Sequence, residues 1–147
     1  MRRLVASSIG IFLVLTAAAG APNPTPDKDL FSLVEGTWGW DDPKKGGACK
    51  TNPEVISISA DKKQATFKKS KPSKNLGTGR TETEWEYAIL YAEGNKLTML
   101  MKDEIRRTDT GSRVIWVLTL KNSNTYTWSR TDLKETWGNV VRCVPRS

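Results

Sequence analysis

The chain has 147 residues, with 23 lysines and arginines, 16 aspartates and glutamates and no histidine, so its formal net charge is +7. The lack of histidine excludes histidine general bases, Ser-His and Cys-His nucleophiles, and every metal site that needs an imidazole ligand. The length suits one domain with a single hydrophobic core.

Residues 1–21 are predicted to be a secretory signal peptide. Arg2 and Arg3 precede an apolar run that ends in small residues, where two cleavage patterns fit. The alternative, a membrane anchor, needs about 20 apolar residues, and this run is shorter and contains serines. We therefore expect an exported protein, periplasmic or secreted, with no transmembrane anchor and no nucleic-acid partner.

The rest of the chain divides into a linker and one domain. Residues 22–28 are polar and rich in proline, which is typical of a linker, and residues 29–147 form the globular part. Residues 29–36 are the one helical candidate, a short N-terminal turn. We expect this domain to be monomeric.

From residue 36 onward apolar residues recur with a period of two, which indicates strands. The clearest segment is 81–92, where glutamates occupy one face and threonine, isoleucine and aromatic side chains the other. Short hairpins without crossover helices predict an all-β antiparallel up-and-down barrel of about eight strands. The expected strands are 36–41, 53–60, 64–70, 81–92, 96–103, 113–121, 125–132 and 139–145.

Cys49 and Cys143 are the chain's two cysteines. In an oxidising compartment such a distant pair is most simply a disulfide, whereas a redox-active pair would have Cys-x-x-Cys spacing. Closing a loop of roughly a hundred residues contributes at most about 4 to 5 kcal/mol. Barrel closure would place the first and last strands side by side. A bridge between Cys49, just after the first strand, and Cys143, in the last strand, agrees with such closure.

A short N-terminal turn followed by Gly36-Thr37-Trp38 at the start of the first strand resembles the lipocalins and the wider calycin group. The resemblance implies a lipocalin-like barrel in which Trp38 plugs the closed end. It also implies that a basic residue near the last strand stacks across the indole, with Arg142 and Arg130 as the candidates. Such a cation-π contact contributes about 0.5 to 2 kcal/mol.

Seven large side chains are expected on inward faces. An eight-stranded barrel is either filled by such side chains or wide enough for one small ligand, and the pattern leaves both possibilities open. If a cavity exists, these residues are the candidate ligand-binding wall: Trp40, Trp85, Tyr87, Tyr91, Met99, Trp116 and Trp128.

Catalytic and metal chemistry find little support in the sequence. The acidic pairs Asp41-Asp42 and Asp103-Glu104 are adjacent residues, so on strands they point to opposite faces and cannot act on one bond. A calcium site at Asp41-Asp42 has too few ligands in view. We expect no enzyme activity, no cofactor and no metal.

Two functions from different classes follow. The leading hypothesis is an exported binding protein for a small apolar or amphipathic molecule. The alternative is a protein-binding module, such as a hydrolase inhibitor, whose basic segment 61–80 contacts an acidic protein or an anionic envelope component. Four lysines are its candidate contacts: Lys68, Lys69, Lys71 and Lys74. A solvated hairpin whose lysines discourage edge pairing is the simpler explanation of this charge.

Overall fold

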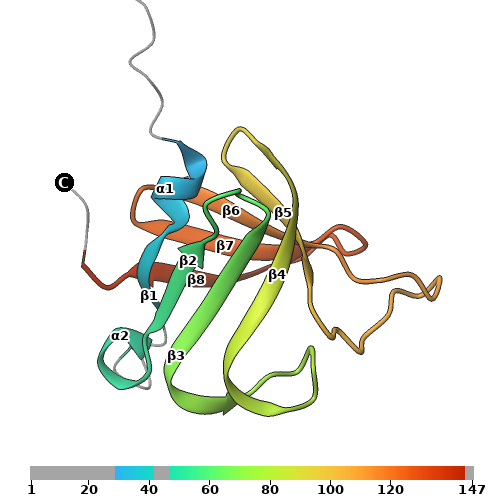
Figure 1. Cartoon of the computed structure of the whole chain (residues 1–147), viewed down its shortest axis with the longest axis horizontal. Helices are drawn as coiled ribbons and strands as arrows, with labels where there is room; N and C mark the ends of the chain where they lie inside the picture. Colours follow the sequence, from blue (N-terminus) through green and yellow to red (C-terminus); the bar gives the residue numbers. More distant parts are fainter. Residues whose placement is uncertain (1–28, 42–46, 145–147) are drawn as a thin grey trace, which may run out of the picture.

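The computed structural model describes residues 29–41 and 47–144 (Figure 1). The predicted signal peptide and linker, together with Asp42, lie outside these residues. Within the described part of the chain, no helix has both the length and the apolar composition needed to cross a membrane.

The described chain is an eight-stranded barrel with two short helices, which confirms the predicted fold class. The strands pair in sequence order, each antiparallel to the next, and β8 closes the barrel against β1. The elements are α1 (Leu30–Val34), β1 (Gly36–Trp40), α2 (Ala48–Thr51), β2 (Glu54–Ile58), β3 (Gln64–Lys74), β4 (Thr81–Glu93), β5 (Lys96–Met101), β6 (Trp116–Asn122), β7 (Thr125–Arg130) and β8 (Thr136–Arg142).

The closure between β1 and β8 is locked by the predicted disulfide. Trp38 lies opposite Arg142 in the ladder, and Cys143, the next residue, is bonded to Cys49 in α2. The bridge joins residues 94 positions apart, so it removes much of the freedom of the unfolded chain.

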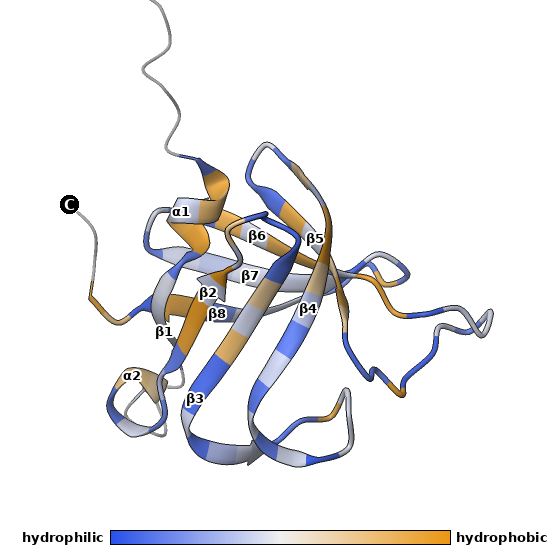
Figure 2. Cartoon of the chain, in the orientation of Figure 1, coloured by the Kyte–Doolittle hydropathy of each residue, from blue (hydrophilic) through white to orange (hydrophobic). Residues whose placement is uncertain are grey.

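The period of two places the core inside the barrel. On β5, Leu97, Met99 and Met101 are buried, and apolar and polar residues alternate along β3 and β4 (Figure 2). Because the side chains of a strand alternate between its two faces, this pattern fills one side of the sheet with apolar groups.

β4 departs from the simple alternation. Its register against β5 shifts between Ile89 and Tyr91, where Leu90 is an extra residue. Such a bulge reverses the faces of the residues that follow it. Tyr91, predicted to point inward, therefore shares a face with Thr98 and is 57% exposed.

β8 begins three residues earlier than predicted. Gly138 has a φ of 70°, and the register against β7 shifts between Tyr126 and Trp128, so a bulge lies at this glycine. The strand continues through this bulge to Thr136, which adds Trp137 to the sheet opposite Trp128.

The two ends of the barrel differ. α1 packs beside the start of β1, where its Val34 is fully buried in the core. The opposite end carries the connections β3–β4, β5–β6 and β7–β8, which extend away from the barrel (Figure 1). This second end is the one that opens into a pocket.

Candidate functional site

The end covered by α1 is closed by Trp38 and Arg142. Trp38 is fully buried and its Nε1 donates a hydrogen bond to the Val34 carbonyl at 2.8 Å. The Arg142 guanidinium lies 4.0 Å from the centre of the indole ring and donates to the carbonyls of Glu35, Ser123 and Leu33. Of the two arginines proposed from the sequence, Arg142 therefore occupies this place.

Gly36 is needed for this arrangement. A Cβ built at Gly36 would lie 2.3 Å from Arg142 Nη1, and the glycine has a φ of 135° that other residues rarely adopt. In the sequence Gly-Thr-Trp, the glycine therefore makes room for the cation that covers the tryptophan two residues later.

The open end holds a pocket of about 360 Å³ with an aromatic wall. Its volume lies at the small end of the range for ligand sites. Five of the chain's six tryptophans line the pocket, which answers the choice between a filled barrel and a cavity in favour of a cavity at this end. The aromatic residues of the wall are Trp40, Phe67, Trp85, Tyr87, Trp116, Trp128 and Trp137.

Sequence reasoning identified part of this wall. Trp40, Trp85, Tyr87, Trp116 and Trp128 line the pocket as predicted. Two other candidates do not line it: the fully buried Met99 lies in the core, and the β4 bulge turns Tyr91 outward. Phe67 and Trp137 belong to the wall but were missed, the latter because the last strand was predicted to begin only at residue 139.

The rings hold one another in place around Trp128. Its centroid lies 5.6 Å from that of Tyr87, in a stacked arrangement, and 6.0 Å from that of Trp116, edge to face. Trp116 in turn contacts Trp137 at 6.0 Å. Aromatic pairs of this kind contribute about 0.5 to 1.5 kcal/mol beyond their buried area, so the rings of the wall fix one another's positions.

Trp40 forms the rim of the pocket and lies directly on Gly138. It is 37% exposed, and a Cβ at Gly138 would lie 2.1 Å from its Cζ3 atom. The two glycine-flanked tryptophans of β1 thus differ: Trp38 belongs to the closed end and Trp40 to the pocket.

Replacing Gly138 with alanine should displace the Trp40 indole and strain the backbone, with a loss of about 1 to 3 kcal/mol in the free energy of unfolding. Gly111→Ala is the matched control, because Gly111 has a similar φ of 79° but no atom near its Cβ position. Urea unfolding should show the larger loss for Gly138→Ala. Equal losses would mean that Trp40 does not depend on this glycine.

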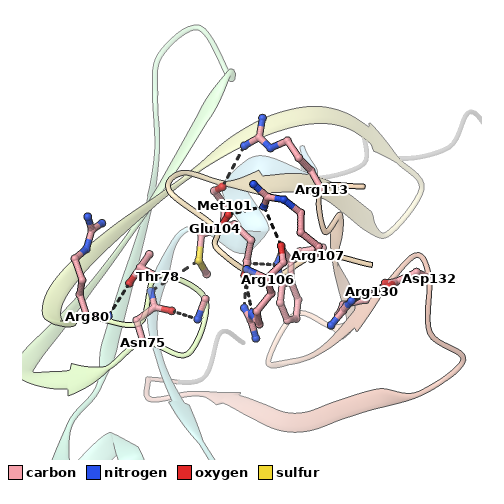
Figure 3. Close-up of polar contacts among 12 residues, drawn as sticks. Asn75, Thr78, Arg80, Met101, Glu104, Arg106, Arg107, Arg113, Arg130 and Asp132 are labelled. Carbon is pink, nitrogen blue, oxygen red and sulfur yellow. Dashed lines mark hydrogen bonds and ion pairs between the residues drawn. The ribbon is translucent and has the colours of Figure 1, made fainter. Parts of the chain in front are cut away.

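Four basic side chains also line the pocket. Arg106 and Arg130 are each held by an acid, Glu104 at 2.5 Å and Asp132 at 2.6 Å (Figure 3). Lys69 and Lys74 form no ion pair within the described residues, although the Lys69 amine lies 5.3 Å from the Trp85 ring centre. Positive charge that is not held in a close ion pair, beside an aromatic wall, attracts an anionic group.

The acid that holds Arg106 also fixes an indole of the wall. Glu104, in the β5–β6 connection, accepts hydrogen bonds from Arg106 Nε and Nη2 and from Trp116 Nε1 at 2.5, 3.0 and 3.0 Å (Figure 3). Burial opposes the ionisation of Glu104, but these hydrogen bonds outweigh it and lower its pKa. The Glu104 carboxylate is therefore a satisfied, structural group.

Glu54, at the start of β2, is a second buried carboxyl, and it lines the pocket. It is 4% exposed, and Tyr126 Oη donates to its Oε1 at 3.4 Å, near the limit of a hydrogen bond. Burial raises its pKa to about 7, although Lys69 and the Tyr126 hydrogen bond act in the opposite direction. The sequence analysis did not single out this residue.

The four lysines of the alternative hypothesis divide between the pocket and the rest of the surface. Lys69 and Lys74 line the pocket, whereas Lys68 lies outside it with its amine 3.8 Å from Glu84. Lys71 is exposed away from the pocket. Simple alternation would place Lys69 with Lys71, but the register of β3 against β4 shifts between Lys68 and Ser73, so Lys69 and Lys74 line the pocket together.

Among the described residues, no group of three or more cysteine, aspartate or glutamate side chains is placed to hold a metal ion. Comparisons of the chain with protein-family models, with curated protein sequences and with solved structures gave no match. The pocket is therefore the feature of the molecule that points to a function.

Proposed function

We propose that this chain is a non-enzymatic binding protein whose barrel takes up a small amphipathic molecule with a flat apolar body and an anionic end. The observation that carries the proposal is the composition of the pocket. Five tryptophans surround a space of about 360 Å³, and Lys69 and Lys74, which form no ion pair within 4.0 Å in the described residues, bring positive charge to it.

The wall and the charges recognise different parts of such a ligand. Indole and phenol faces pack against an apolar ring system over a large area, and the pocket buries it away from water. The lysines, with Arg106 and Arg130 beside them, offer charge-assisted hydrogen bonds to a carboxylate, sulfonate or phosphate. A purely apolar ligand would form no hydrogen bond with these basic side chains.

We further propose that the protein is lipocalin-like and works after export. The short α1, the Gly36-x-Trp38 sequence and the guanidinium of Arg142 over that indole support the first part. The disulfide between Cys49 and Cys143 supports the second, since such bonds persist in oxidising compartments.

Three probes with one bicyclic body test the preference for an anion: 2-naphthoate, 2-naphthalenemethanol and 2-naphthylmethylammonium. In equilibrium dialysis at pH 8, 2-naphthoate should bind about tenfold more tightly than the alcohol, because a charge-assisted hydrogen bond contributes more than a neutral one. The cation should bind least. Failure of all three to bind, or equal affinities, would contradict the proposal.

β3 offers a matched pair of variants for the same test. Lys69→Gln/Lys74→Gln removes two charges inside the pocket, and Lys68→Gln/Lys71→Gln removes two outside it. The net charge falls equally in both. Only the first variant should lose affinity for 2-naphthoate, whereas equal losses would point to a general electrostatic effect.

A further inference from the structure

Two buried glutamates lie beside the pocket, and their surroundings differ. Glu104 receives two hydrogen bonds from the Arg106 side chain and one from Trp116. Glu54 is equally buried, but its one hydrogen bond within the described residues is the long one from Tyr126. An ionised carboxylate can accept about four hydrogen bonds, so Glu54 has unused acceptor capacity.

The unused capacity of Glu54 faces the pocket. Among the described residues, the one enclosed side-chain polar atom without a hydrogen-bond partner is Thr127 Oγ1. The second carboxyl oxygen of Glu54 also has no such partner, so it is not enclosed by protein and must border the open space that Glu54 lines. The indoles of Trp38 and Trp116 donate elsewhere, to Val34 and to Glu104. Lys69 and Tyr87 also face Glu54, but neither donates a hydrogen bond to it within the described residues.

Resting on the proposed function, we infer that Glu54 determines ligand specificity by accepting a hydrogen bond from a hydroxyl or N–H donor at the buried end of the ligand. The ligand class is then an aromatic or similarly flat acid with a donor group away from its acidic group. A buried acceptor without a donor is unfavourable, so a ligand lacking the donor binds less tightly.

The charges around Glu54 agree with this assignment. Lys69 faces it from β3, and the phenols of Tyr87 and Tyr126 from β4 and β7. A ligand carboxylate placed beside Glu54 would be repelled, so the acidic end is expected toward Lys74, Arg106 and Arg130, and Lys69 contributes to its attraction over a longer distance. The pKa of about 7 means that the carboxyl is largely ionised, and thus a strong acceptor, at pH 8.

The test uses 2-naphthoate, 6-hydroxy-2-naphthoate and 6-methoxy-2-naphthoate at pH 8 with the folded, disulfide-bonded protein. The hydroxyl compound should bind about tenfold more tightly than the other two, since it alone carries a donor at the far end of the ring system. Glu54→Leu should bind the hydroxyl and unsubstituted compounds equally. Glu54→Gln keeps an acceptor of the same shape and should retain part of the preference.

Glu84→Gln, on the outer face of β4, is the control and should keep the full preference. Circular dichroism establishes that each variant is folded. If the hydroxyl compound has no advantage in the wild type, or keeps it in Glu54→Leu, the role of Glu54 is wrong while the proposed function stands. Failure of all three naphthoates to bind would overturn both.

Discussion

Replacing Trp38 with alanine should lower the free energy of unfolding by about 3 to 5 kcal/mol, a large part of the stability of a small domain. The indole is fully buried, contacts the Tyr126 ring at 4.8 Å and supports the Arg142 guanidinium at 4.0 Å. Its removal leaves a cavity and takes away the ring against which Arg142 of the last strand packs. Urea unfolding followed by circular dichroism measures the loss.

Trp40→Ala is the natural comparison, because Trp40 lies two residues further along the same strand but is 37% exposed at the rim of the pocket. It should cost about 1 kcal/mol in stability and weaken the binding of 2-naphthoate. Similar losses of stability in the two variants would contradict the division into a structural and a ligand-facing tryptophan.

The barrel was predictable because the sequence patterns that specify its strands and turns are local. Alternating side chains along 81–92 and 96–103, with short turns between strands, require only a period of two and an antiparallel connection. The disulfide followed from having two cysteines, and the pairing of Trp38 with Arg142 or Arg130 from a family resemblance. The structure confirms the barrel and its closure.

The composition of the pocket was only partly predictable, because bulges break the alternation on which the prediction depended. One extra residue, Leu90, turns Tyr91 to the outside, and the bulge at Gly138 brings Trp137 into the wall. A period-of-two analysis contains no signal for the first. For the second, a tryptophan just before a Gly-Asn pair was the available hint.

Glu54 was missed for a different reason. At the start of a strand a glutamate is ordinarily a solvated end residue, and sequence alone does not show that its partners are Trp38 on one side and Lys69 on the other. Burial of the carboxyl is a property of barrel closure. It can be recognised only when strands distant in sequence are placed together.

The stability of the protein should fall between pH 5 and pH 8 by an amount on the order of 3 kcal/mol, because of Glu54. Below its ordinary pKa of 4.5 the carboxyl is protonated in both the folded and the unfolded chain. Between 4.5 and about 7 the unfolded chain has lost this proton and the folded protein keeps it, so rising pH favours unfolding. Urea unfolding across this range measures the slope.

Because the chain has no histidine, no imidazole titrates between pH 5 and pH 8. The effect of Glu54 on stability is therefore not combined with that of a histidine. The buried or paired acids whose pKa values are lowered, such as Glu104 and Asp132, act at lower pH and with the opposite sign. Glu54→Gln should abolish the fall and be more stable than the wild type at pH 8, whereas Glu93→Gln, on the exposed part of β4, should leave it unchanged. A wild-type stability that stays level from pH 5 to pH 8 would contradict the assignment.

The expected gain in stability of Glu54→Gln at pH 8 indicates that Glu54 has a role other than stabilising the fold. A barrel selected for stability alone has no use for a carboxylate in an aromatic pocket, because glutamine or leucine of similar size would avoid the cost of burying its charge. A ligand donor that occupies the free acceptor offsets that cost only when the ligand is bound. Saturating 6-hydroxy-2-naphthoate should therefore stabilise the wild type at pH 8 more than it stabilises Glu54→Gln, since tighter binding to the folded state gives a larger increase in the free energy of unfolding.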